Sequence, residues 1–133
     1  MSEYRERANA LCAEEKDALA RIPPPTRLQE FAAYLEELLR VGRRYERKDD
    51  ETLEPPPLEL RELHQRAERV DARLEAGLER TIERMKRSDA PGVTLAREIR
   101  KLNPDIQQGI ELARKAGLKE CAEVALPTEQ RAT

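Results

Sequence analysis

The chain has 133 residues, of which 39% are charged, and its 25 Lys and Arg against 27 Asp and Glu give a formal net charge of −2. Ala, Glu, Lys, Leu and Arg together number 80, well above the roughly half that is typical of long helices, so the composition predicts an all-α fold. The five Gly, one Phe and absence of Trp argue against a β-sandwich or a dinucleotide-binding α/β domain, and the balanced charge excludes a global attraction to nucleic acid or anionic membranes.

Prolines divide the sequence into four segments with helical periodicity. The proline runs at 23–25 and 55–57 cannot lie inside helices, and the turn-forming residues 88–92 make a third break. The predicted helices span residues of about 3–22, 26–48, 58–87 and 93–117. Because short connections favour antiparallel neighbours, we predict an up-down-up-down antiparallel four-helix bundle at 3–126, with a flexible tail at 127–133.

The first predicted helix carries an apolar stripe that Glu15 interrupts. Glu14 and Glu15 point in different directions on a helix, and we interpret both as solvated. The second helix is predicted to begin at Thr26, which forms a capping box with Gln29. Residues 49–54 are predicted as an exposed acidic linker behind it.

The fourth predicted helix contains Pro104, which should kink or break it. Gly117 followed by Leu118 fits a left-handed cap, so the helix is expected to end before Cys121.

The only cysteines, Cys12 and Cys121, lie near opposite ends of the chain. Their spacing alone leaves two interpretations open, namely a disulfide formed in an oxidising compartment and two buried thiols on helix faces. In the predicted topology the first helix begins at the end of the bundle where the fourth finishes. The segment after Gly117 can then fold back and bring the two cysteines together, which favours the disulfide.

The sequence holds no motif for catalysis or metal binding. The di-metal chemistry of helix bundles needs Glu-x-x-His pairs, and the residue three before the only histidine, His64, is Arg61. Two distant cysteines and one histidine do not supply a zinc site. A Cys12 nucleophile assisted by His64 is the one enzymatic alternative, and no local motif supports it. We therefore predict that the protein is not an enzyme and uses no cofactor or metal.

Arginines recur along one side of the third predicted helix. They are Arg66, Arg69, Arg73, Arg80, Arg84 and Arg87. The stripe could bind an acidic partner, anionic lipid headgroups or a phosphate backbone. The scarcity of aromatic residues that stack on bases favours a solvated face, paired with Glu62, Glu83 and acidic residues of adjacent helices, over a nucleic-acid site.

Tyr34 and Val41 lie seven residues apart on the second predicted helix, off its main apolar stripe, and Tyr4 lies near the N-terminus. These residues could form a second apolar contact for dimerisation or for a partner helix. The interpretation that we favour places them over the side of the core.

Two short motifs connect the chain to a known family. They are Ala-Asn-Ala-Leu-Cys at 8–12 and Gly-Leu-Lys-Glu-Cys at 117–121. Over residues 4–122 the chain resembles an uncharacterised family of small helical proteins from actinobacteria and their relatives, which are often exported or lipid-anchored. The resemblance implies a secreted or envelope-facing bundle in which Cys12 is joined to Cys121, and it implies no catalytic residues.

These observations predict a non-enzymatic, exported helical bundle with a binding or scaffolding role in the cell envelope. Its partner would be another protein or a second copy of the chain, and a lipid anchor on the native chain is compatible with this role. The chain itself shows no apolar export signal and no stretch of roughly 18 apolar residues that could span a membrane. The alternative is a cytoplasmic regulatory or nucleic-acid-associated protein that uses the arginine stripe.

Overall fold

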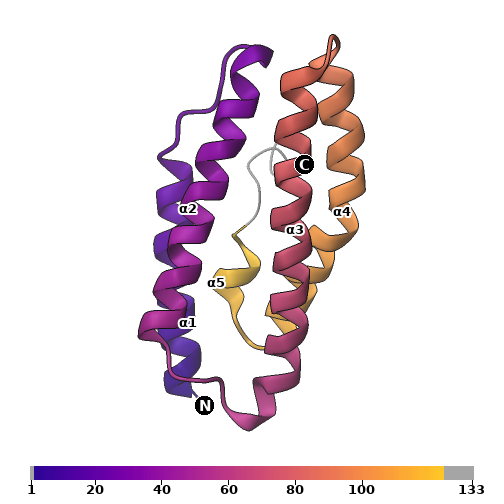
Figure 1. The fold of residues 1–133 in the computed structure, drawn as a ribbon. Helices are drawn as coiled ribbons and strands as arrows, with labels where there is room; N and C mark the ends of the chain where they lie inside the picture. The colour runs from indigo at the N-terminus through magenta and orange to yellow at the C-terminus, as the bar shows by residue number, and fades with distance from the viewer. Residues whose placement is uncertain (1, 125–133) are drawn as a thin grey trace.

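The protein is all-helical in a computed structural model that describes residues 2–124 (Figure 1). The helices, in chain order, are α1 (Ser2–Ala20), α2 (Phe31–Thr52), α3 (Arg61–Arg87), α4 (Pro91–Lys115) and the short α5 (Lys119–Ala122). Two 3-10 turns, η1 (Leu28–Glu30) and η2 (Leu58–Leu60), lead into α2 and α3. The four long helices lie lengthwise beside one another and alternate in direction (Figure 1). The tail predicted at 127–133 lies outside the described residues.

The predicted start of the second helix is wrong. Arg27 is extended, with φ −123° and ψ 144°, so Thr26 cannot lead directly into a helical turn and forms no capping box with Gln29. The chain first tightens into η1, where the Glu30 amide donates to the Arg27 carbonyl over 3.1 Å. α2 then begins at Phe31, and no side chain caps it through a hydrogen bond.

The predicted acidic linker at 49–54 is also wrong in its first part. Residues 49–52 form the last turn of α2, and the Leu53 amide donates to the Asp49 carbonyl over 2.9 Å. The Thr52 hydroxyl donates to the Lys48 carbonyl over 2.6 Å, which adds a hydrogen bond to this turn. A run of acidic residues therefore continued the helix instead of ending it.

α4 continues through Pro104, so the alternative of a broken helix is wrong. Pro104 lies on the exposed face, where water can reach the Arg100 carbonyl that lacks its usual amide partner. The left-handed cap predicted at the end of this helix is confirmed. Gly117 has a φ of +76°, and the Leu118 amide donates to the Ala113 carbonyl over 2.9 Å.

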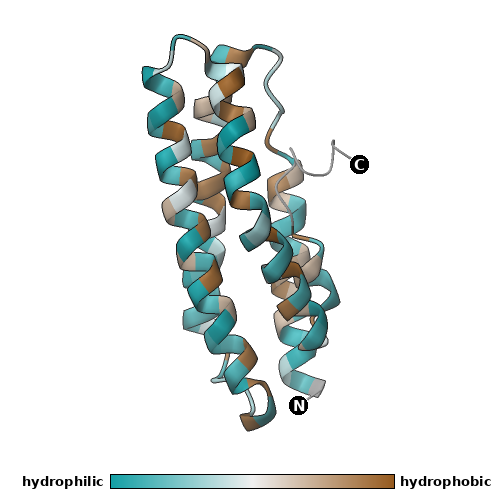
Figure 2. Cartoon of the chain, turned by 90° about the vertical axis from the view of Figure 1, so that its right-hand side faces the viewer, coloured by the Kyte–Doolittle hydropathy of each residue, from teal (hydrophilic) through white to brown (hydrophobic). Residues whose placement is uncertain are grey.

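The main core lies in the half of the molecule near the α3–α4 turn. It contains buried residues of α2, α3 and α4, namely Ala32, Tyr34, Leu35, Leu38, Leu39, Leu78, Ile82, Met85, Leu102 and Ile106. Tyr34 and Val41 are only 7% and 4% exposed, so the alternative of a second apolar contact surface is wrong for both residues. The hydropathy colouring shows brown residues recurring along the helices among teal ones (Figure 2).

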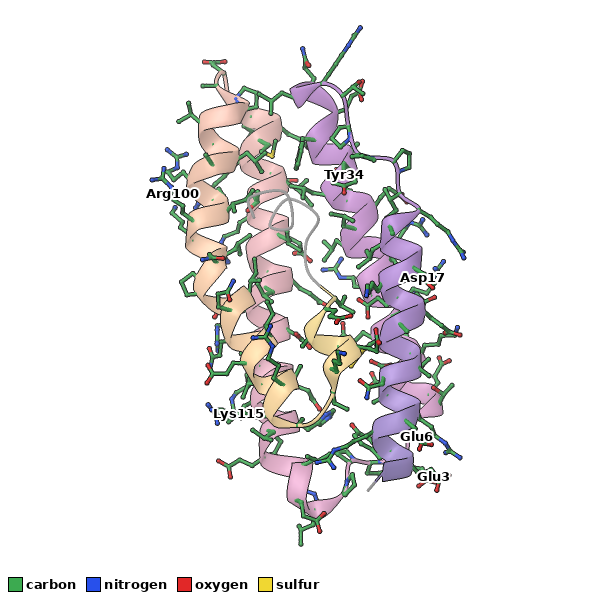
Figure 3. The ribbon with its side chains drawn as sticks, turned by 180° about the vertical axis from the view of Figure 1, so that it is seen from behind. Glu3, Glu6, Asp17, Tyr34, Arg100 and Lys115 are labelled. Carbon is green, nitrogen blue, oxygen red and sulfur yellow. A yellow bond between two sulfur atoms is a disulfide. The ribbon has the colours of Figure 1, made fainter. Side chains whose placement is uncertain are left out.

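Charged side chains occupy the outside of the molecule. Those labelled in Figure 3 are all exposed, namely Glu3, Glu6, Asp17, Arg100 and Lys115. The high charge content of the chain is therefore accommodated largely on the outer helix faces. α5 packs against both α1 and α4, and in Figures 1 and 3 it lies between these two helices.

The turn before α5 gives the first testable prediction. Ala at position 117 would have to adopt a positive φ, and its Cβ would stand 2.8 Å from the Arg5 Nε, which donates to the Ala116 carbonyl over 2.8 Å. We expect Gly117→Ala to lower the free energy of unfolding by about 1–2 kcal/mol in urea titrations. The control is Gly42→Ala, inside α2, because no atom lies within 4 Å of its Cβ position. This variant should gain about 0.5–1 kcal/mol, and equal effects of the two substitutions would contradict the prediction.

Candidate functional site

A cavity of about 560 Å³ lies inside the other half of the molecule, beside the main core. All four long helices line it, together with the turn between α2 and α3 and the segment that follows α4. Binding sites for small molecules usually enclose roughly 300–1,000 Å³. The cavity therefore has the size of a ligand site and not of a packing defect between helices.

One wall of the cavity is apolar and comes from α4. Its lining residues are Ile106, Gly109, Ile110, Leu112, Ala113 and Ala116. Beyond the end of α4, Leu118, Cys121 and Val124 continue this surface. α4 lines the cavity with residues three and four positions apart because these share one helix face.

The other three long helices contribute apolar residues and, in addition, a group of carboxylates that we call the acidic wall. Glu15 comes from α1, Glu46 and Asp49 come from α2, and Asp71 and Glu75 come from α3. Glu46 and Asp71 remain exposed whereas Glu15 is half-buried. Asp49 and Glu75 are half-buried like Glu15, so the wall combines carboxylates that water reaches freely with others that are partly sheltered.

Glu15 has the most strongly altered pKa of these carboxyl groups. Burial raises its pKa from 4.5 to about 8, and the negative charges of Asp49, Asp71 and Glu46 raise it further in that direction. At neutral pH the Glu15 carboxyl is therefore largely protonated. The prediction that Glu15 is solvated is wrong, whereas Glu14 is exposed and lies 3.4 Å from the Lys48 Nζ.

Three further carboxyl groups of this wall, those of Glu46, Asp49 and Asp71, also have a raised pKa. Burial raises the pKa of Asp49 to about 6, with a contribution from Asp50. The surrounding protein raises the pKa of Asp71 to about 6 although its side chain stays open to solvent, and Glu75 and Asp49 add to this effect. Glu46 shares a hydrogen bond with Glu75, which is the largest cause of its raised pKa. The carboxyl groups of Glu15, Glu46, Asp49 and Asp71 thus lie near other negative charges and are partly sheltered from water, and both effects raise their pKa values.

Few basic groups approach this acidic wall. The Arg43 Nε lies 3.7 Å from a Glu75 oxygen, but Arg43 does not line the cavity. His64 does line it, and its Nε2 lies 2.5 Å from a Glu68 oxygen one turn later on α3. Tyr4 lines it too, and burial followed by the charges of Asp49 and Glu68 raises the pKa of its phenol.

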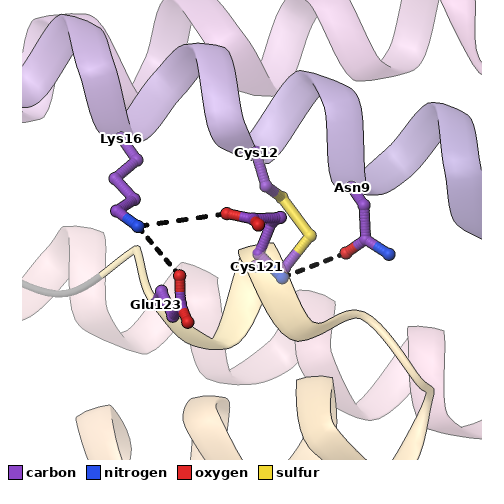
Figure 4. A network of polar contacts seen from close by, with 6 residues as sticks. Asn9, Cys12, Lys16, Cys121 and Glu123 are labelled. Carbon is purple, nitrogen blue, oxygen red and sulfur yellow. Dashed lines mark hydrogen bonds and ion pairs between the residues drawn. A yellow bond between two sulfur atoms is a disulfide. The ribbon is translucent and has the colours of Figure 1, made fainter.

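The structure brings the two cysteines together at the rim between α1 and α5. Their sulfur atoms lie 2.11 Å apart, which is the distance of a disulfide bond, and both residues line the cavity (Figure 4). Beside them, the Lys16 Nζ donates to a Glu123 oxygen over 2.8 Å. The Glu120 amide donates to the Asn9 side-chain oxygen over 3.1 Å, so polar contacts flank the cysteine pair on both sides.

The arginine stripe lies outside the cavity. Arg66 is half-buried, and Arg69, Arg73, Arg80, Arg84 and Arg87 are exposed. Three of the six contact carboxylates. Arg73 lies 3.1 Å from Asp105 of α4, Arg87 lies 3.3 Å from Glu83, and Arg84 pairs with the buried Glu98 of α4. The contacts of Arg73 and Arg84 connect α3 to α4, the contact of Arg87 lies within α3, and all three neutralise part of the stripe.

No three His, Cys, Asp or Glu side chains within residues 2–124 are arranged so that they could hold a metal ion. No helix in the same range is long and apolar enough to cross a membrane.

Sequence reasoning missed the acidic wall, although one signal for it was present. Glu15 interrupts the apolar stripe of α1, and a charge on a buried face indicates either a partner or a cavity. The sequence pattern predicts a linker at residue 49, and a linker gives no reason to expect that Asp49 shares one face of α2 with Glu46. A second missed signal is the spacing of Arg5, Asn9, Cys12 and Lys16 along one face of α1, where each of them contacts α5 or the turns beside it.

Comparisons with protein-family models, with curated proteins and with solved structures find no match to this chain.

Proposed function

We propose that this protein is a non-enzymatic binding module that holds a small, partly apolar molecule in the cavity between its helices. The observation that carries the proposal is the cavity of about 560 Å³ with a continuous apolar wall from α4. A helix bundle of this size usually fills its interior with side chains, because empty apolar volume reduces stability. A molecule that occupies the cavity would restore those contacts.

The enzymatic alternative has less support. It requires a free Cys12 thiolate beside His64, whereas the Cys12 sulfur lies at bonding distance from that of Cys121. His64 is already in contact with Glu68.

The same proposal includes the architecture and the location of the protein. The alternating helices are assigned to an up-down-up-down four-helix bundle that a disulfide between Cys12 and Cys121 closes. Such a bond persists in oxidising compartments, which supports an exported protein at the cell envelope, as the resemblance implies. α5 would then act as a plug that the disulfide holds between α1 and α4.

Filling the cavity tests the proposed function. Gly42 lines the cavity on α2, and nothing stands within 4 Å of its Cβ position. We expect the fluorescence of Nile red, a neutral apolar dye, to rise on binding to the wild-type protein with one site per chain. Gly42→Leu should place its side chain in the cavity and weaken this binding by about tenfold or more, while its Tm equals or exceeds that of the wild type.

The matched control is Gly42→Ala, which adds one methyl group at the same place and should retain dye binding within about threefold. A wild-type protein that does not bind the dye, or a Gly42→Leu variant that binds it unchanged, would contradict the proposed function.

A further inference from the structure

The cavity lining is apolar along α4 and mixes apolar residues with carboxylates along α1, α2 and α3. Every residue of α4 that lines it is apolar or glycine, whereas α1, α2 and α3 contribute carboxylates. A ligand that fills the cavity therefore contacts both apolar side chains and carboxylates, which favours a molecule with an apolar part and a polar part. This condition already excludes a wholly apolar molecule as the best-matched occupant.

The charged residues of the lining are all acidic among the described residues. Eight Asp and Glu residues line the cavity and no Lys or Arg does so among the described residues, in a chain that has 25 Lys and Arg. Among these carboxylates, Glu15, Asp49 and Glu75 are half-buried, whereas Glu46 and Asp71 are exposed. Outside the cavity, carboxylates such as the buried Glu98 and the half-buried Glu123 have a Lys or Arg partner.

A cation in the cavity would be attracted to these carboxylates and would relieve the repulsion among them. A positive group between Glu15 and Asp71 would interact with several negative charges where water is partly excluded, so the attraction is larger than at the surface. The carboxylates are also strong hydrogen-bond acceptors for N–H donors.

A metal ion does not fit these observations. The carboxylates are distributed over a volume of about 560 Å³, and no set of three within residues 2–124 has the spacing of metal ligands. A quaternary ammonium group fits poorly as well, because among the described lining residues Tyr4 is the only Phe, Tyr or Trp, and one such ring does not form an aromatic cage. A protonated primary or secondary amine matches the acceptors.

We propose that the ligand is an amphiphilic amine, whose ammonium group binds the Asp71 carboxylate and the Glu15 carboxyl group while its apolar body lies against α4. Glu15, which is largely protonated without the ligand, gives up its proton when the cation binds beside it. This inference rests on the proposed function, because it assumes that the cavity takes a small molecule. It adds the chemical class of that molecule and the orientation in which it binds.

A head-group series tests the inference with Nile red as reporter. Octylamine, 1-octanol and octanoate have the same apolar chain and differ in charge, and each competes for the dye at pH 7.5. We expect octylamine to displace the dye at a concentration at least about tenfold lower than 1-octanol, because charge-assisted hydrogen bonds exceed neutral ones. Octanoate should be the weakest of the three.

Substitutions then test which carboxyl groups cause the preference for octylamine over 1-octanol. Glu15→Gln combined with Asp71→Asn should reduce the advantage of octylamine over 1-octanol to less than about threefold. Glu14→Gln is the matched control, because it removes the same charge one residue away on the exposed face, and it should retain the full preference.

The two proposals fail in different ways. If Nile red binds in the cavity but 1-octanol competes as well as octylamine, the amine inference is overturned and the binding function stands. The same holds if the double variant keeps the full preference for octylamine. If Nile red does not bind and calorimetry detects no binding of octylamine, both proposals are overturned.

Discussion

Replacing both cysteines, as Cys12→Ala with Cys121→Ala, is expected to lower the free energy of unfolding by about 4–5 kcal/mol. The proposed disulfide joins residues 109 positions apart, and closing so long a loop restricts the unfolded chain strongly. Domains of this kind are stable by only about 5–15 kcal/mol, so the loss is a large fraction of the total. In thermal unfolding it corresponds to a decrease in Tm of roughly 15 °C.

The control for this prediction is Lys16→Ala, on the same face of α1. It removes the contact with Glu123, whose side chain is 42% exposed, while that of Lys16 is 44% exposed. An ion pair so open to solvent contributes less than about 1 kcal/mol. The disulfide itself is tested by thiol titration of the denatured, unreduced protein, where no reactive thiol is expected. Two reactive thiols would overturn the disulfide and weaken the assignment to an oxidising compartment.

Helical segments were predictable from the sequence because apolar residues at every third or fourth position allow few other structures. The proline runs and the cap at Gly117 fixed most breaks for the same local reason. The start of α2 was not predictable from the Thr26 and Gln29 pair, because a capping box requires a backbone conformation that Arg27 does not adopt. α5 was missed because four residues that dock through Cys121 have no periodicity of their own.

The cavity depends on how far apart the helices stand, and no local pattern encodes that distance. Gly42 and Gly109 line it and contribute no side chain to its volume, yet in the sequence each is only a gap in a helical stripe. The insertion of α5 beside α1 and α4 brings a further segment into the lining. Glu15 had a local signal, but its meaning required the positions of Asp49 and Asp71 on two other helices.

The thin core and the acidic cavity are related features of this molecule. Apolar residues are scarce, and α2, α3 and α4 concentrate them in the half near the α3–α4 turn. In the other half, Cys12, Asn9 and Lys16 hold α5 in place at the edge of the cavity. The cysteine pair and these hydrogen bonds would hold this half of the molecule together around a ligand site that side chains do not fill.

Glu15→Gln is expected to stabilise the protein at alkaline pH and to change little at acidic pH. The folded-state pKa of Glu15 is about 8 against 4.5 for the free side chain, so the folded protein keeps this proton after the unfolded chain has lost it. The free energy of unfolding must then fall as pH rises from about 4.5 to 8 and stay reduced above that range.

Glutamine resembles the protonated carboxyl and removes this part of the pH dependence. One pKa unit corresponds to about 1.4 kcal/mol, and solvent around the half-buried side chain screens part of this effect. We therefore expect Glu15→Gln to raise the free energy of unfolding by roughly 2 kcal/mol at pH 9 and by less than about 0.5 kcal/mol at pH 4.5. Urea titrations of both proteins across this range measure it. Glu14→Gln provides the comparison, since the Glu14 side chain is exposed and pairs with Lys48, and it should not gain stability at either pH. If Glu15→Gln is no more stable than the wild type at pH 9, the Glu15 carboxyl is not sheltered and the acidic wall does not accumulate the repulsion that a bound cation would relieve.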